Sequence, residues 1–415
     1  MSPTPRAAAV LAVIALATVV VGPAIALIAA LALAGATVAD ALAVRARPRL
    51  ERRVAPILAR GVAAPLTVEA VPAGPGRVRV RQPIPPDLAL DPREADGGLD
   101  ARLTPLRRGR HTLGAVAART EGPLRLGRWH HQDGEEHEVL VYPDLPAARR
   151  LALAVRQGRF REQGRLTRGP LGLGTDFESI RDYAPDDDPR QINWRATDRL
   201  GRPMSNQFRV EQDREVMLLL DAGRLMASPL EDRTRLDAAV DAAVTVALVA
   251  DVVGDRCGVV AFDDGIRCRL PPRRAGGDAV VRALFDLEPR PVDADYELAF
   301  QTVEGAKRSL IVVFCDLLEE AAARPLVDAV PVLARRHVVL VASVRDPDLD
   351  AQLATRPDTP RDVYGQAVAL DVLAARSRVA HQLKRAGASV IEAPAGALPA
   401  ACVRAYLQAK ARARL

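Results

Sequence analysis

Two aspartates each follow a short apolar run in the second half of the chain. Asp221 closes the run Val216–Leu220, and Asp316 closes the run Leu310–Cys315. Continuous apolar runs that alternate with helical stretches predict buried, mostly parallel strands. Ligand crevices in such sheets lie beyond the carboxyl ends of the strands. We therefore expect the two carboxylates at one edge of a sheet, where their oxygens could hold Mg²⁺.

The surroundings of Asp221 and Asp316 resemble the metal-ion-dependent adhesion site of the von Willebrand factor A domain, over roughly Glu215–Leu415. That family uses Asp-x-Ser-x-Ser, a threonine and a further aspartate, and the two aspartates match. Three positions that carry hydroxyl ligands in the family are apolar or glycine here: Gly223, Leu225 and Ala294. The resemblance therefore implies a degenerate site that holds no metal or binds Mg²⁺ weakly.

A second constellation lies in residues 176–199, where charged residues are mixed with Tyr183 and Trp194. Its arginines can pair bidentately with its aspartates. Such pairs could lock the segment onto the following domain or present a docking surface, and a hydrolase that uses Asp186–Asp188 is a further alternative. The residues expected to bind a partner are Arg181, Tyr183, Asp187, Asp188, Arg190, Trp194 and Arg195.

This segment resembles the hallmark of the family catalogued as domain of unknown function 58, approximately F-E-x-x-R-x-Y-x-P-G-D-D-x-R-x-I-x-W. Asp186 stands at the usual glycine. The resemblance implies two N-terminal membrane helices, a β-domain (here with Arg107–Gly114) and a von Willebrand factor A-like domain. Family members are often encoded beside MoxR-type AAA ATPases and membrane transglutaminase-like proteins. It therefore implies an envelope-related assembly role with a MoxR-type ATPase as partner.

The remaining polar groups carry no recognisable catalytic motif. A histidine and glutamate group surrounds Gln132-Asp133-Gly134, a pattern typical of an exposed hairpin turn; its members are His130, His131, His137, Glu135 and Glu136. The stretch 169–174 lacks the lysine and hydroxyl of a phosphate loop, and no nucleophile elbow is recognisable. We therefore predict that the protein is not an enzyme.

The basic composition does not predict a nucleic-acid partner. The net charge is +6, but only three of the 58 basic residues are lysines, and aromatic residues make up 3% of the chain. Few aromatic platforms are therefore available for base stacking. The basic residues next to the N-terminal apolar segment instead fit anionic lipid headgroups.

The segment Ala7–Ala39 contains no charged residue. As one helix it would be ~50 Å long, whereas a bilayer core is about 30 Å thick. Gly22 and Pro23 interrupt the segment near its middle, so we expect a hairpin of two membrane spans. Arginines flank both ends, which predicts a body that faces the cytoplasm. A cleaved signal peptide is the alternative, but its apolar region is usually only about 7–15 residues long.

These patterns predict a multidomain chain. Residues 1–45 form a transmembrane helical hairpin, 46–146 a small antiparallel β-sandwich, and 147–210 a linker with the signature segment. Residues 211–415 form a doubly wound α/β domain of von Willebrand factor A type.

The function expected from these patterns is that of a membrane-anchored, non-enzymatic scaffold that binds membrane lipid and a protein partner, with no cofactor beyond weak Mg²⁺. A Mg²⁺-dependent adhesion module is the first alternative, and a hydrolase is the less favoured one.

Overall fold

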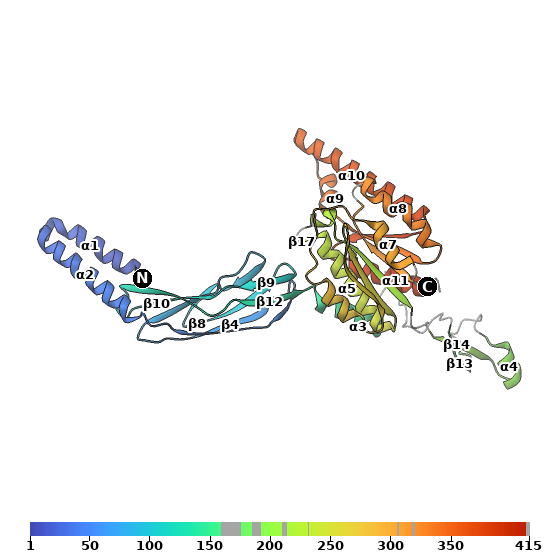
Figure 1. The fold of residues 1–415 in the computed structure, drawn as a ribbon, viewed down its shortest axis with the longest axis horizontal. Helices are drawn as coiled ribbons and strands as arrows, with labels where there is room; N and C mark the ends of the chain where they lie inside the picture. The colour runs from blue at the N-terminus through green and yellow to red at the C-terminus, as the bar shows by residue number, and fades with distance from the viewer. Residues whose placement is uncertain are drawn as a thin grey trace. The chain divides into compact units, whose positions relative to one another are not determined.

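The chain divides into two compact units, Met1–Tyr142 and Pro143–Leu415. The structure is a computed structural model (Figure 1). It describes residues 1–158, 176–184, 192–209, 214–230, 232–304, 307–317 and 320–411.

Two apolar helices, α1 (Pro5–Val21) and α2 (Pro23–Ala43), open the first unit and pack side by side (Figure 1). Gly22 separates them with a φ of 81°, a backbone conformation that glycine adopts at little cost. Pro23 suits the first position of the second helix. The apolar run therefore breaks where the Gly-Pro pair predicts. Helix α2, at 21 residues, is long and apolar enough to cross a membrane by length and composition, whereas α1 is shorter.

The rest of the first unit is built from short strands arranged in three sheets. Their orders are β1-β11-β10-β5-β7, β2-β4-β8-β6 and β3-β12-β9, and every pairing is antiparallel except that of β3 with β12. The strands are β1 (Ser2–Pro3), β2 (Arg49–Val54), β3 (Ile57–Ala59), β4 (Ala64–Val71), β5 (Arg77–Arg81), β6 (Leu88–Asp91), β7 (Glu94–Asp96), β8 (Gly98–Pro105), β9 (Gly109–Leu113), β10 (Val116–Glu121), β11 (Gly127–Asp133) and β12 (His137–Tyr142).

One apolar core is shared by the three sheets of this unit. Alternate residues of the strands point inward, as the period-two pattern of the sequence requires. Leu66 and Leu103 come from one sheet, Val80 from a second and Val139 from the third, and all four are fully buried. Burial of this one face holds the antiparallel sheets together.

The carboxyl end of α2 is bound to the turn between β10 and β11 by a buried aspartate. Asp40 is 3% exposed. Its carboxylate accepts hydrogen bonds from the backbone N–H groups of Leu124 (2.9 Å), Leu126 (2.9 Å) and Gly127 (3.0 Å). A Cβ on Gly122 would lie 2.2 Å from the Asp40 carboxyl carbon. Only glycine therefore allows the turn to approach the helix this closely.

The second unit contains a six-stranded sheet of order β19-β18-β15-β20-β21-β22. All neighbours are parallel except β18 and β19, so β19 is an antiparallel edge strand that the sequence patterns did not predict. The strands are β15 (Glu215–Asp221), β18 (Arg256–Phe262), β19 (Ile266–Arg273), β20 (Leu310–Phe314), β21 (Val338–Arg345) and β22 (Ser389–Pro394).

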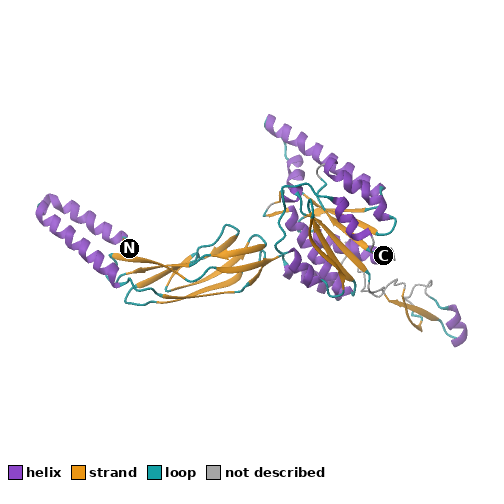
Figure 2. Cartoon of the chain, in the orientation of Figure 1, coloured by secondary structure: helices purple, strands orange, loops and turns teal. Residues whose placement is uncertain are grey.

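Helices pack on both faces of this sheet (Figure 2). Helices α7, α8 and α10 share one apolar core with alternate residues of the strands, whereas α5 packs against α3, α6 and α11. The helices are α3 (Leu145–Arg156), α5 (Arg235–Val253), α6 (Gly277–Leu284), α7 (Tyr296–Glu304), α8 (Glu320–Ala334), α9 (Pro347–Ala354), α10 (Pro360–Arg385) and α11 (Leu398–Ala411). Sheets covered on both faces have the continuous apolar strands seen here.

The signature segment folds as a hairpin with a short helix between its strands. Strand β13 (Asp176–Asp182) pairs antiparallel with β14 (Met204–Arg209), and α4 (Trp194–Leu200) lies between them in the chain. The Asn193 side chain caps α4 by accepting a hydrogen bond from the Ala196 N–H. Gly201, with a φ of 64°, ends the helix. The predicted partner-binding residues Asp187, Asp188 and Arg190, and the alternative cluster Asp186–Asp188, lie outside the described residues.

Candidate functional site

Asp221 and Asp316 lie at the carboxyl ends of neighbouring strands. Asp221 is the last residue of β15, and Asp316 follows β20, which pairs directly with β15. Both residues are 3% exposed. The chain order changes direction here, because β15 has β18 on one side and β20 on the other. Crevices at such positions of an α/β sheet commonly bind ligands.

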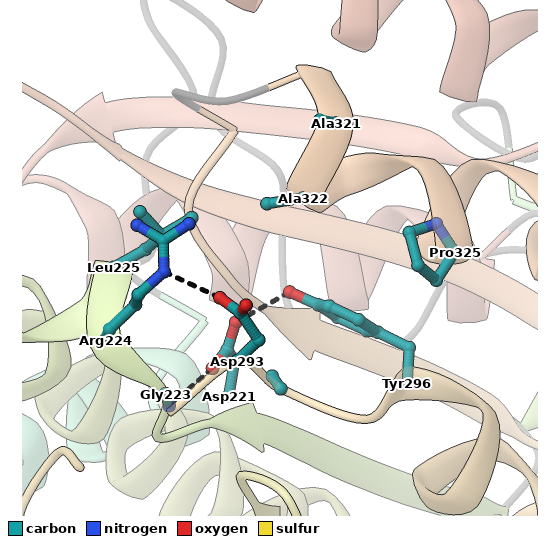
Figure 3. Close-up of a pocket in the computed structure, with 10 residues that line it drawn as sticks. Asp221, Gly223, Arg224, Leu225, Asp293, Tyr296, Ala321, Ala322 and Pro325 are labelled. Carbon is teal, nitrogen blue, oxygen red and sulfur yellow. Dashed lines mark hydrogen bonds and ion pairs between the residues drawn. The ribbon is translucent and has the colours of Figure 1, made fainter. Parts of the chain in front are cut away.

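The Asp221 carboxylate is held by two neutral donors (Figure 3). The Tyr296 hydroxyl donates to it at 2.6 Å and the Gly223 N–H at 2.7 Å. Burial raises the pKa of Asp221, and the charges of Asp316 and Asp263 raise it further, while the two hydrogen bonds act in the opposite direction. Burial also raises the pKa of Tyr296 well above its usual value. Tyr296 therefore keeps its proton and remains a donor.

The Asp316 carboxylate instead faces a buried arginine. The guanidinium of Arg235 lies 3.3 Å from it, and the two side chains are only 4% and 1% exposed. Arg235 also donates to the Val344 carbonyl at 3.3 Å and pairs with Asp346 at 3.3 Å. It begins helix α5, directly after the capping residue Thr234. A fixed cation of the protein therefore compensates the charge of Asp316.

At Gly223, one of the three positions without a hydroxyl ligand, the neighbouring backbone leaves too little space for a larger side chain. A Cβ at this position would lie 2.8 Å from the Val292 carbonyl oxygen and 3.2 Å from the Ala294 nitrogen. A serine could enter only if the loop at 292–294 moved. Leu225 and Ala294, at the two other positions where hydroxyls are expected, line the same pocket as Asp221. The loop at 292–294 thus leaves no room for a serine side chain at 223, one of the three positions.

A third aspartate, which the sequence patterns did not single out, lies at this edge of the sheet. Asp263 directly follows β18, and its side chain is fully buried. Burial opposes its ionisation, but Arg267 at 2.7 Å and the Gly265 N–H at 3.1 Å outweigh that effect, and the pKa of Asp263 is lowered. Arg290 lies 3.7 Å away. The available signal was its position after an apolar strand, which it shares with Asp221.

A pocket of about 300 Å³ opens above Asp221. One side is formed by the residues after β15, and the opposite side by the first turns of α8, including Pro325 (Figure 3). At its rim, the Arg224 side chain donates to Asp293 at 2.6 Å. The pocket therefore combines one buried carboxylate, a rim ion pair and apolar walls.

The described residues of the signature segment differ widely in exposure. Trp194 is 72% exposed, and Arg195 is also exposed. The Arg181 side chain donates to the Asp182 carbonyl at 3.1 Å, and the Tyr183 N–H donates to the Pro203 carbonyl at 3.0 Å. Asp182 forms an ion pair with Arg202 at 3.3 Å, a partner that the sequence patterns did not indicate. The hairpin thus presents a large indole to solvent.

The exposed turn expected around Gly134 is present and contains Glu135 and Glu136, but the three histidines lie in the strands on either side of it. His130 and His131 belong to β11, and His137 begins β12. His131 is buried, and burial lowers its pKa. Within the part of the chain that the structure describes, no three His, Cys, Asp or Glu side chains are grouped as a metal site would require.

The raised pKa of Asp221 predicts a pH-dependent loss of stability. The folded state keeps the proton at pH values where the unfolded state, with an aspartate pKa of about 3.9, has lost it. The free energy of unfolding should therefore fall as pH rises from about 4 to the folded pKa, by about 1.4 kcal/mol for each unit between the two pKa values.

The variant Asp221→Asn should not show this decrease in the free energy of unfolding with rising pH. The control variant Asp328→Asn, at an exposed position on α8, should still show it. Urea unfolding of the full chain between about pH 4 and 8 measures both. Identical slopes for Asp221→Asn and the unmodified chain would show that Asp221 has an ordinary pKa.

Comparisons with known proteins give a family but no activity. Residues 179–360 match the family described as "Protein of unknown function DUF58". An uncharacterized protein of Mycobacterium bovis and two of Mycobacterium tuberculosis (strains CDC 1551 and H37Rv) are each 28% identical over 217 residues. This alignment covers 49% of the chain and 66% of each relative, just under two thirds of the relatives' own length.

Among solved structures, an uncharacterized membrane-spanning protein from Vibrio fischeri is 14% identical and covers 49% of this chain and 99% of its own. Its TM-score of 0.18 is too low to carry an argument about fold. The family match, which includes the second part of the signature segment and the edge with Asp221 and Asp316, is therefore the informative result. Residues 179–360 form a DUF58 domain, a member of a family whose function is unknown.

Proposed function

We propose that the protein is a membrane-anchored, non-enzymatic interaction protein whose signature hairpin docks a protein partner. The observation that carries this proposal is the exposure of Trp194. Trp194 is 72% exposed, and tryptophan is among the residues enriched at interaction hot spots. Arg195, the next residue in the chain, and Arg181, on a strand of the same hairpin, would supply directional polar contacts to the partner.

The engaged carboxylates support a role other than catalysis. Asp221 accepts hydrogen bonds from Tyr296 and Gly223, and Asp316 forms an ion pair with Arg235. Both carboxylates therefore already have partners within the described structure. The mostly parallel sheet with aspartates at two strand ends supports a von Willebrand factor A-like domain, and the resemblance to the family supports a MoxR-type AAA ATPase as partner. The first unit, in this proposal, is a β-sandwich that connects the domain to its anchor. The proposed partners do not include nucleic acid.

A Mg²⁺-dependent adhesion module is the second candidate, and the convergence of Asp221 and Asp316 favours it. Mg²⁺ requires near-octahedral oxygen coordination. The steric closure at Gly223 and the arginine at Asp316 weigh against strong binding. We therefore propose no cofactor beyond weak Mg²⁺.

The substitution Trp194→Ala tests the docking proposal. We expect capture of partners from the native membrane by the full chain to fall by at least about tenfold, the equivalent of about 1.4 kcal/mol for one hot-spot residue. The matched control is Tyr364→Ala, because Tyr364 on α10 is 73% exposed. Quantitative affinity capture with mass spectrometry is the measurement. Equal recovery with Trp194→Ala and the unmodified chain would exclude the hairpin as the docking surface.

We further propose that α1 and α2 both cross the membrane and that the body faces the cytoplasm. Both ends of the helix pair are tied to the β10–β11 hairpin. The Thr4 N–H donates to the Leu126 carbonyl at 2.9 Å, and Asp40 binds the N–H groups of the same turn. Two ends held by one turn must lie on one side of a bilayer, which supports an even number of crossings. At ~1.5 Å per residue the helices are ~25 and ~31 Å long, close to the bilayer core.

Labelling of an engineered cysteine tests this topology. Val20, in the last turn of α1, is 88% exposed, and Val20→Cys should react with a membrane-impermeant maleimide added outside intact spheroplasts. A cysteine at exposed Glu135 in the body should react only after lysis. Labelling of Glu135→Cys in intact spheroplasts would place the body outside and overturn the proposed orientation.

A further inference from the structure

The three buried aspartates at the strand ends differ in one respect. Asp316 has Arg235 at 3.3 Å, and Asp263 has Arg267 at 2.7 Å. Asp221 has no arginine or lysine within ion-pair distance among the described residues; its hydrogen bonds come from a hydroxyl and a backbone N–H. Buried carboxylates in proteins are normally paired with a cation or bound to one.

The space next to Asp221 suits a side chain with an apolar stem and a charged end. The pocket of about 300 Å³ lies at the lower end of the range for ligand sites. Leu225, Ala322 and Pro325 provide apolar wall, and Asp221 lies at the base. Lysine and arginine bury their methylene stems against apolar surface in this manner while the charged group meets a polar partner.

The rim of the pocket also selects for charge. Asp293 is 77% exposed and already paired with Arg224, so these two charges offset each other. When Asp221 is ionised, its negative charge has no arginine or lysine within ion-pair distance among the described residues. An acidic guest would meet a like charge in a desolvated site, and like charges placed together in an interface disfavour association.

We propose that this pocket receives the ammonium or guanidinium group of a lysine or arginine side chain presented by the protein partner. The proposal rests on the interaction role proposed above and names the chemistry of the guest. The guest cation would donate to the Asp221 carboxylate and keep it ionised, while Tyr296 and the Gly223 N–H hold the carboxylate in place. A metal-dependent adhesion site offers a cation to an acidic partner, whereas this pocket offers a carboxylate to a basic one.

The test uses the full chain in detergent and two short peptides, acetyl-Gly-Lys-Gly-amide and the same peptide with norleucine in place of lysine. Norleucine keeps the stem and lacks the charge. We expect the lysine peptide to bind at least about tenfold more tightly by calorimetric titration. Asp221→Asn should abolish the difference, whereas Asp328→Asn, an exposed acid on α8, should preserve it. Equal affinities for the two peptides, or selectivity that survives Asp221→Asn, would overturn the proposal.

A second variant distinguishes a loss of binding from a loss of folding caused by Asp221→Asn. Leu225→Trp fills the pocket and leaves the carboxylate in place, and it should weaken the lysine peptide by a similar factor. Unchanged binding to Leu225→Trp would place the peptide elsewhere and contradict the proposal.

A titration with MgCl₂ alone tests whether Mg²⁺, instead of a basic side chain, binds at Asp221. Micromolar Mg²⁺ affinity that is lost in Asp221→Asn would replace the basic guest by a metal. If the peptides fail to bind selectively while Trp194-dependent capture persists, the pocket proposal alone fails. If Trp194→Ala captures its partners normally, the docking proposal fails whatever the peptides do.

Discussion

Replacement of Asp40 by alanine should destabilise the first unit by about 2–4 kcal/mol, because one buried and two partly buried backbone N–H groups lose their acceptor, and a buried donor without a partner costs about 1–3 kcal/mol. The donors are the backbone N–H groups of Leu124, Leu126 and Gly127, at 2.9 to 3.0 Å. A loss of this size is a large part of the stability of a typical domain.

The fluorescence of Trp129 provides the measurement. This residue lies in β11, next to the affected turn, and Trp194 is the second tryptophan of the chain. In a Trp194→Phe background, urea unfolding of the full chain in detergent therefore reports on the first unit alone. The control Asp100→Ala removes an exposed carboxylate from β8 and should change stability by less than about 0.5 kcal/mol.

The conservative variant Asp40→Asn separates charge from shape. Its amide has one acceptor oxygen and presents an NH₂ group to the remaining donors, so we expect an intermediate loss. A wild-type unfolding curve for Asp40→Ala would mean that Asp40 does not hold the turn. The topology proposed for the anchor would then lose one of its two attachments.

The parts of the fold that could be predicted from the sequence depend on local patterns. A stretch of about ten residues is enough to predict each of three features: the break at Gly22-Pro23, the strand before Asp221 and the strand before Asp316. The antiparallel edge strand β19 was missed, because alternating half-buried residues such as those of Ile266–Arg273 lack the apolar run of a central strand.

The partners of the site residues could not be predicted, because they come from distant parts of the chain. Arg235 is 81 residues from Asp316, and Tyr296 is 75 residues from Asp221. No local spacing relates such pairs; only the order of the strands in the sheet brings them together. The need for glycine at 223 is likewise a property of the loop at Val292, which a single sequence does not reveal.

The second large effect is expected from Lys410→Met in the last helix. Lys410 on α11 lies 2.6 Å from Asp255, just before β18, and the two side chains are 4% and 0% exposed. The Tyr406 hydroxyl and the Arg214 N–H also donate to Asp255. Burial lowers the pKa of Lys410, although the ion pair with Asp255 acts in the opposite direction. The pair therefore fastens α11 to the amino-terminal edge of the sheet, opposite the edge that carries Asp221.

Methionine keeps the length and apolar stem of Lys410 but leaves Asp255 as a buried carboxylate without its cation. Removal of one partner of a buried ion pair costs about 3–5 kcal/mol. The double variant Asp255→Asn, Lys410→Met should be less destabilised than the sum of the single changes, because it leaves no uncompensated charge. Hydrogen exchange of peptides that span β15 and β18 in the full chain measures the opening free energy of the sheet. The exposed control Lys384→Met on α10 should leave that exchange unchanged, and additivity of the two buried substitutions would show that Lys410 and Asp255 do not depend on each other.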